Sequence, residues 1–228
     1  MKKTILGRPI EKGRPERGRF LRRDIHRISA AAWSHFETLF KEREADIYPG
    51  IGNRHNVLLA GLTIAVYRSL REVGIQKEYA IELVSDSGWK LYSGFIPILR
   101  FVARLMRKDP QQQLNLMLKM LMAFPFSAPG RPGYEVEISE EENRFGTFWT
   151  FCPPLHFVRE FVGANGDDGE LELFRNTWCT YDWAFTSLMM EKSSGAEGHY
   201  ERPHTLSRGD EVCDMYWYAS EPEQGVPG

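Results

Sequence analysis

All three cysteines lie in the second half of this 228-residue chain, near residues that could assist thiol chemistry. Cys152 follows an aromatic run and precedes Pro153-Pro154, so it lies at the expected start of a helix, whose positive end favours the thiolate. His156, four residues later, could accept the thiol proton, since a Cys–His pair is the minimum set for nucleophilic catalysis. The alternative is a small buried cysteine and a surface histidine, and spacing alone favours it.

Cys179 and Asp182 form a Cys-x-x-Asp pair inside a predicted helix, where residues three apart share a face. A carboxylate there could orient a histidine or bind a cationic, amidine-like group. Asp182 could equally be a first-turn residue whose charge only complements the helix dipole. Both interpretations stay open.

Cys213 and Asp214 lie on the last predicted strand, where neighbouring side chains point to opposite faces. One of the two therefore faces the core. An aspartate among aromatic residues is unfavourable in a strand and needs a partner if it is buried. We expect Asp214 to be buried and hydrogen-bonded.

Zinc binding is another use for these thiols, because three cysteines with His156 or His204 could form a Cys₃His set. None of these residues has the short two-residue spacing typical of structural zinc, so we expect no metal, and we expect no cofactor. Arg54 and His55 lie at the expected mouth of a central helix, and helix N-termini favour carboxylates. These two residues could therefore meet an anionic substrate.

The elements that must position these residues change in character along the chain. A helical period marks residues 24–43, and residues 54–73 are apolar almost all round and end at Gly74, a typical helix stop. Beyond the Pro/Gly-rich stretch 125–133, alternation at 134–139 and an aromatic run at 144–151 indicate strands. We expect a loop at 48–53, further helices at 76–85, 97–108, 111–123 (capped by Asp109), 153–162 and 176–190, and a closing hairpin of 200–206 with 211–218. This order predicts an α+β fold, with a helical N-terminal half followed by a small antiparallel sheet packed with helices.

The N-terminus is strongly basic, with ten Lys or Arg in residues 1–27 against Glu11, Glu16 and Asp24. Such an arm can contact nucleic acid, an anionic surface or an acidic partner. The formal net charge of −2 argues against a dedicated nucleic-acid binder, so we favour a solvated or partner-clasping extension, and a homo-oligomer formed through it stays open. We expect a flexible arm over 1–23, one domain over 24–220 (helical part 24–124, mixed part 134–220) and a tail over 221–228.

Composition narrows the class of protein further. The hydrophobic content of 42% excludes a wholly disordered chain. Apolar runs fall short of the about 20 residues that a spanning helix needs, and no apolar core follows the basic start as it would in a secretory signal. An odd number of cysteines fits thiols in a reducing compartment. We expect a cytoplasmic protein with no membrane partner.

The ordered motifs together resemble the L-2-amino-thiazoline-4-carboxylic acid hydrolase family. The resemblance covers roughly residues 53–218 and departs from the family's usual form in Met215-Tyr216-Trp217, in the basic arm and in Pro153-Pro154. These departures suggest a bulkier or more apolar substrate, as in a specialised biosynthetic pathway. The motifs that carry the resemblance are Tyr67-Arg68-Ser69-Leu70-Arg71-Glu72-Val73-Gly74, Cys152, Cys179-x-x-Asp182, and Thr205-Leu206-Ser207-Arg208-Gly209 leading to Cys213-Asp214-Met215.

The family's named activity opens a cyclic thiazoline by hydrolysis of a carbon–nitrogen bond. The resemblance therefore implies a hydrolase for a small cyclic amidine or related ring, with a cysteine as nucleophile or acid/base. The alternatives are a ring-forming or isomerising enzyme, a small-molecule binding protein with the same site, and an interaction protein that uses its arm. The candidate catalytic residues are Cys152, Cys179, Asp182, Cys213, Asp214 and His156, and the candidate substrate-binding residues are Arg54, His55, Arg68, His204 and Trp217.

Overall fold

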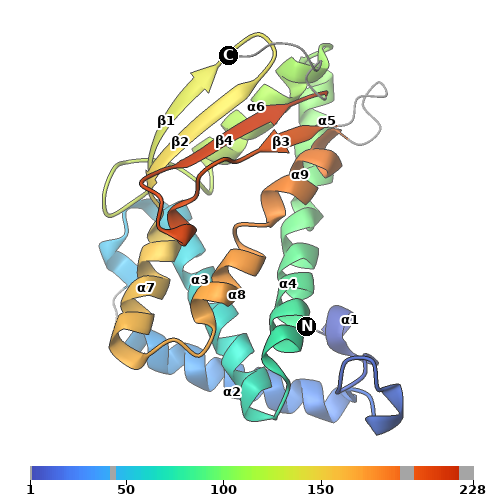
Figure 1. The fold of residues 1–228 in the computed structure, drawn as a ribbon. Coiled ribbons are helices and arrows are strands. Elements are labelled where there is room, and N and C mark those ends of the chain that lie inside the picture. Colours follow the sequence, from blue (N-terminus) through green and yellow to red (C-terminus); the bar gives the residue numbers. More distant parts are fainter. Residues whose placement is uncertain (1, 42–44, 191–197, 221–228) are drawn as a thin grey trace. The chain divides into compact units, whose positions relative to one another are not determined.

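The structure is a computed structural model that describes residues 2–41, 45–190 and 198–220, and it confirms the α+β class (Figure 1). The chain divides into two compact units that alternate along the sequence. Unit 1 comprises Met1–Tyr48, Arg54–Tyr92 and Pro153–Cys179, and unit 2 comprises Pro49–Asn53, Ser93–Cys152 and Thr180–Gly228. The predicted mixed part, residues 134–220, is therefore divided between the two units, because residues 153–179 belong to unit 1 with the N-terminal helices.

Unit 1 is built from helices. Its core joins the buried apolar faces of several helices, with Ile28, Leu70 and Leu83 at most 1% exposed. Helix α3 is the nearly all-apolar helix that the sequence predicts at 54–73, and its first residues, Gly50–Asn53, are counted with unit 2. The helices of unit 1 are α1 (Lys2–Ile5), α2 (Arg22–Lys41), α3 (Gly50–Glu72), α4 (Lys77–Tyr92), α7 (Pro153–Asn165) and α8 (Glu170–Thr177).

The N-terminal segment, which we expected to be a flexible arm, is folded against α4 instead. Ile5 and Phe20 are almost fully buried in the core of unit 1. The Tyr79 hydroxyl donates to the Pro9 carbonyl at 2.8 Å, and Arg8 pairs with Asp86 at 2.6 Å. Apolar side chains placed among the cations give the segment a hydrophobic anchor, which a count of charges does not reveal.

Among its described residues, unit 2 contains a four-stranded antiparallel sheet in the order β1-β2-β4-β3, together with the helices α5, α6 and α9. The closing hairpin is confirmed as the β3–β4 pair, in which His199 lies opposite Tyr218. Asp109 caps α6 as predicted, because its side chain accepts from the Gln112 amide at 2.8 Å. The elements are β1 (Glu135–Glu140), β2 (Phe145–Phe151), β3 (His199–Glu201), β4 (Cys213–Tyr218), α5 (Ile96–Met106), α6 (Pro110–Ala123) and α9 (Tyr181–Met190).

The predicted helix 176–190 is confirmed over its C-terminal part as α9, which ends at Met190 as expected, but it begins too early, because the chain turns at 178–180 between α8 and α9. The run Thr177-Trp178-Cys179-Thr180 consists of residues with modest helix propensity, which favours a break there. The predicted loop 48–53 is also wrong in part, since α3 already begins at Gly50. No helix within the described residues is long and apolar enough to cross a membrane.

Candidate functional site

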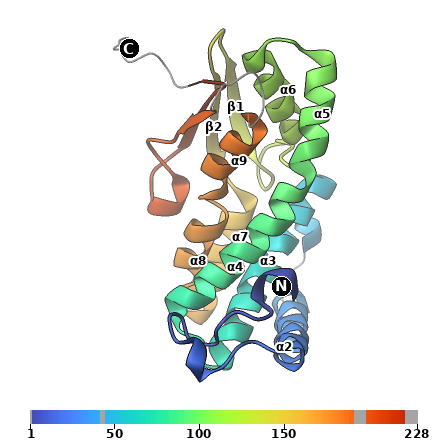
Figure 2. The ribbon, with the colours of Figure 1, turned by 90° about the vertical axis from the view of Figure 1, so that its right-hand side faces the viewer.

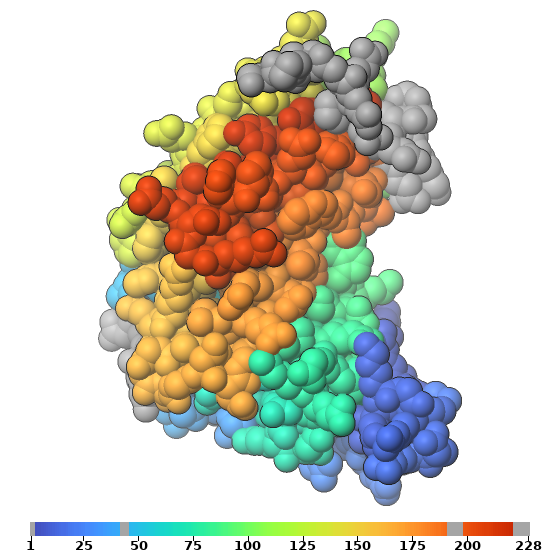
Figure 3. Space-filling view, in the orientation of Figure 1, coloured from blue at the N-terminus to red at the C-terminus, as the bar shows by residue number. Residues whose placement is uncertain are grey.

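The N-terminal end of β4 and the loop before it, residues 202–212, form a polar centre in unit 2. The loop folds on itself through the Thr205 amide, which donates to Asp210 at 2.7 Å. It turns back toward β4 at Gly209, whose φ of +104° is a conformation that favours glycine. In Figure 3 this loop is part of a continuous orange-red surface with β3 and β4.

Cys213, the first residue of β4, is a hydrogen-bonded thiol under this loop. Its side chain is buried, with 7% of the residue exposed. The Leu206 amide donates to Sγ at 3.0 Å, and the Thr205 hydroxyl lies 3.4 Å from it. Burial raises the pKa of the thiol, and the two hydrogen bonds oppose that rise. Cys213 is therefore protonated at neutral pH, and chemistry through it needs a base.

Asp214 is buried and hydrogen-bonded, as the sequence predicts. Its two carboxylate oxygens accept from the backbone amide of His204 at 2.6 Å and contact the His204 ring Nδ1 at 2.8 Å. The hydrogen bond and the negative charge of Asp214 raise the pKa of His204. Asp214 thus fixes both the loop and an imidazole whose side chain is 59% exposed.

Asp182, in the first turn of α9, is the second acidic centre of unit 2. Its Oδ2 accepts from the Tyr200 hydroxyl and from Arg202 Nη1, both at 3.3 Å. Although 31% of its side chain is exposed, the surrounding protein desolvates the carboxyl group and raises its pKa to about 6, against the opposing effects of Arg202 and Tyr200. Asp182 can therefore exchange a proton near neutral pH.

The two centres are linked by charge: besides burial and its hydrogen bonds, the pKa of the Cys213 thiol is lowered by Arg202 and raised by Asp182. Arg202, with a side chain only 7% exposed, lies 4.7 Å from the ring centre of Trp183. The Trp183 ring packs edge-on against Tyr200 at 4.7 Å. We call Asp182, Tyr200, Arg202 and Cys213 the thiol cluster. It combines a buried thiol, a carboxyl group with a raised pKa, a hydroxyl donor and a buried cation.

Cys152 and Cys179 lie on other segments of the chain than the residues of the thiol cluster. Cys152, half-buried, follows β2 at the end of a unit 2 segment, whereas His156 lies on α7 of unit 1 and pairs with Glu160 at 3.5 Å. Cys179 is the last residue of a unit 1 segment and lies in the turn before α9, so it does not share a helix with Asp182. None of the three cysteines forms a disulfide.

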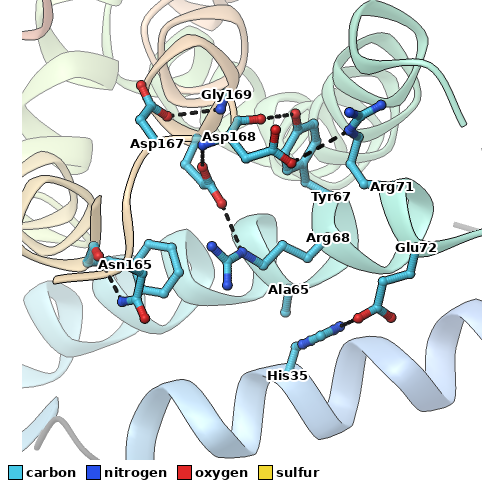
Figure 4. Close-up of polar contacts among 12 residues, drawn as sticks. His35, Ala65, Tyr67, Arg68, Arg71, Glu72, Asn165, Asp167, Asp168 and Gly169 are labelled. Carbon is cyan, nitrogen blue, oxygen red and sulfur yellow. Dashed lines mark hydrogen bonds and ion pairs between the residues drawn. The ribbon is translucent and has the colours of Figure 1, made fainter. Parts of the chain in front are cut away.

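The expected substrate-binding residues of unit 1 have other surroundings. Arg68 donates through Nε to Glu170 at 2.8 Å and lies over the Phe161 ring at 4.4 Å. It therefore belongs to an ion pair between α3 and α8 whose carboxylate is fully buried, while 33% of the Arg68 side chain is exposed. Figure 4 shows Arg68 pointing from α3 toward the segment that contains Asp168 and Gly169. Arg54 pairs with Asp46 at 3.0 Å, and His55 is exposed. Both lie past the first turn of α3, because this helix begins at Gly50.

Trp217 in unit 2 is a core residue with 5% exposure. Its ring centre lies 5.3 Å from that of Tyr200, so Trp217 packs against one residue of the thiol cluster. The zinc alternative finds no geometric support, since no group of three or more His, Cys, Asp or Glu side chains suits a metal ion in the part of the chain that the structure describes.

Tyr200 and Arg202 are the site residues that sequence reasoning missed. They alternate around Glu201 at the expected start of a strand, and period two sends both to the same side. The alternation can be seen in the sequence. The contact of both residues with Asp182 could not be predicted from the sequence, because it depends on how α9 packs against β3.

No family model, no curated protein and no solved structure matches this chain.

Proposed function

We propose that this protein is a hydrolase that opens a small cyclic amidine, thiazoline or related ring at a carbon–nitrogen bond, with Cys213 as nucleophile. The observation that carries the proposal is the thiol cluster, in which a hydrogen-bonded thiol lies within electrostatic range of a titratable carboxyl and a buried guanidinium. The ordered cysteine and aspartate motifs support the same reaction class.

The first step forms a bond between Sγ of Cys213 and the amidine carbon. Asp182 takes the thiol proton and returns it to the ring nitrogen, after which the ring carbon–nitrogen bond breaks. Arg202 is held by Asp182 and Trp183 and gives a fixed positive charge for a substrate carboxylate. Tyr200 keeps its proton, because burial and the charge of Asp182 raise its pKa well above the usual value.

The second step releases the product. Water attacks the same carbon and gives a proton to Asp182, and the bond from carbon to Sγ breaks as the thiol regains its proton. The net reaction adds one water across the carbon–nitrogen bond. In this proposal His204 exchanges protons between the site and solvent, which its contact with Asp214 and its 59% exposed side chain support.

Single cysteine variants test this assignment, with turnover of a 2-aminothiazoline carboxylate as the readout. We expect Cys213→Ala to lose at least about 10³-fold in kcat, because the covalent route disappears. Cys152→Ala and Cys179→Ala are matched controls and should keep turnover near that of the wild type. Circular dichroism checks that all three variants are folded.

The proposal fails if Cys213→Ala turns over normally while folded. Tight binding of the ring compound by the wild type without any product would instead indicate a binding protein. A ring-closed or isomerised product would indicate the non-hydrolytic alternative.

A further inference from the structure

Helix α5 of unit 2 carries apolar side chains on two opposite faces. Ile96 and Ala103, seven residues apart, are fully buried and hold the helix on its unit. Ile98, Phe101 and Leu105 follow a three- and four-residue spacing, so they form one stripe on the opposite side. These three side chains are 66%, 63% and 72% exposed. We call them the outer stripe of α5.

An exposed stripe of this kind is unusual for a surface helix, whose outward face is normally polar. Figure 2 shows α5 beside α6 at the edge of unit 2. Met106, 56% exposed, extends the apolar surface at the C-terminal end of the helix. An exposed apolar surface of this kind is typical of protein–protein or membrane contact sites.

The charges around the stripe indicate the nature of its partner. Residues 93–108 contain no acidic residue. Of their four cations, Arg100 points toward α9, where it donates to the Leu188 carbonyl at 3.1 Å, and Arg104, Arg107 and Lys108 are exposed. Arg107 and Lys108 directly follow the helix. A partner that complements this surface is apolar and negatively charged.

A second copy of the same stripe does not meet this requirement. In a two-fold contact each patch meets itself, so two α5 helices would bring cations against cations. The surface of an anionic bilayer offers apolar chains beneath negative headgroups, and an amphipathic helix with basic flanks lies in that interface. With 11 residues, α5 is about 16 Å long, far short of the roughly 30 Å hydrocarbon core.

We propose that α5 is an interfacial helix that seats unit 2 on an anionic lipid surface, with the outer stripe in the headgroup region. The sequence predicts no membrane partner on the ground that no segment can span a bilayer. A helix that lies in the plane of the interface needs no spanning segment.

Flotation of the full chain with vesicles tests this proposal. Vesicles of phosphatidylcholine with about 30% phosphatidylserine should carry the protein at about 0.1 M salt, and binding should fall sharply near 1 M salt. Vesicles of phosphatidylcholine alone should carry much less.

Variants assign the binding to α5. Leu105→Ser should weaken it about tenfold, because one large apolar side chain leaves the interface. Ile51→Ser, an equally exposed apolar position at 74% in α3, is the matched control and should have no effect. Arg107→Gln and Lys108→Gln should each weaken binding about fivefold.

Absence of flotation at low salt overturns the proposal, as does equal binding by Leu105→Ser and the wild type. A concentration-dependent dimer that Leu105→Ser abolishes, found in a protein that does not float, overturns it in favour of a second copy.

Discussion

At the scale of single residues, burial is the main influence on the thiol cluster, because it raises the pKa of Asp182, of Tyr200 and of the Cys213 thiol. Cys213 and Asp214 are neighbours on β4, and each accepts a backbone amide from the loop in front of that strand, from Leu206 and His204 respectively. The sequence predicted a buried, bonded Asp214 because an aspartate in an aromatic strand needs a partner. It could not choose among the three cysteines, since their spacing does not encode which helix or strand packs beside each thiol.

The raised pKa of Asp182 leads to a prediction about how the stability of the fold depends on pH. Burial raises its pKa from 3.8 to about 6, so the folded chain holds this proton more tightly than the unfolded chain. The protonated carboxyl therefore stabilises the fold at low pH, and this contribution is lost as pH rises from about 4 to about 6. We expect the free energy of unfolding of the wild type, relative to Asp182→Asn, to fall by about 3 kcal/mol between pH values below and above this window.

Urea unfolding of both proteins at a series of pH values measures this difference. Parallel pH profiles of the two proteins would show that the Asp182 carboxyl has an ordinary pKa. In that case Asp182 would not serve as the proton carrier of the proposed reaction.

At the scale of elements, the sequence predicted well wherever one face of a helix or strand is apolar. The patterns at 24–43 and 54–73 correspond to α2 and α3, and the alternation after 134 corresponds to β1. The prediction failed at α8, whose residues Glu170 and Arg175 hide a buried face made by Leu173 and Phe174. Glu170 is fully buried there, and no local pattern distinguishes a buried, paired carboxylate from a solvated one.

The ion pair between α3 and α8 gives a prediction at this scale. Glu170 accepts from Arg68 at 2.8 Å and from the Asp168 amide at 2.7 Å (Figure 4). Arg68→Met would leave a buried carboxylate without its cation, so we expect a loss of about 3 kcal/mol in the free energy of unfolding. Adding Glu170→Gln to Arg68→Met should recover part of that loss.

Chemical denaturation of the single and double variants measures the coupling between the two side chains. Lys77→Met is the matched control, because it breaks a more exposed pair of α4 and α8, Lys77–Glu172, and should change stability little. Equal stability of Arg68→Met and the wild type would mean that the pair does not hold these helices together. Arg68 would then regain its place among the candidate substrate-binding residues.

At the scale of the whole molecule, the predictions based on charge were less accurate than those based on apolar residues. The basic N-terminus was expected to be an arm, yet Arg8 pairs with Asp86, and Lys12 pairs with Glu82 of the same helix. Pairing between segments about 70 residues apart cannot be read from local sequence. Self-association through this segment stays a prediction. The chain's order of helices and strands likewise predicts the class of fold but not the two interleaved units.

The central claim is that Cys213 of unit 2 becomes covalently bonded to the ring carbon of the substrate. Acid quenching during turnover of a 2-aminothiazoline carboxylate, followed by mass spectrometry of the peptides, tests it most directly. The account predicts an adduct with the mass of the substrate on the peptide that contains Cys213, and unmodified peptides for Cys152 and Cys179. Turnover accompanied by an adduct on Cys152 or Cys179, with Cys213 unmodified, would contradict it.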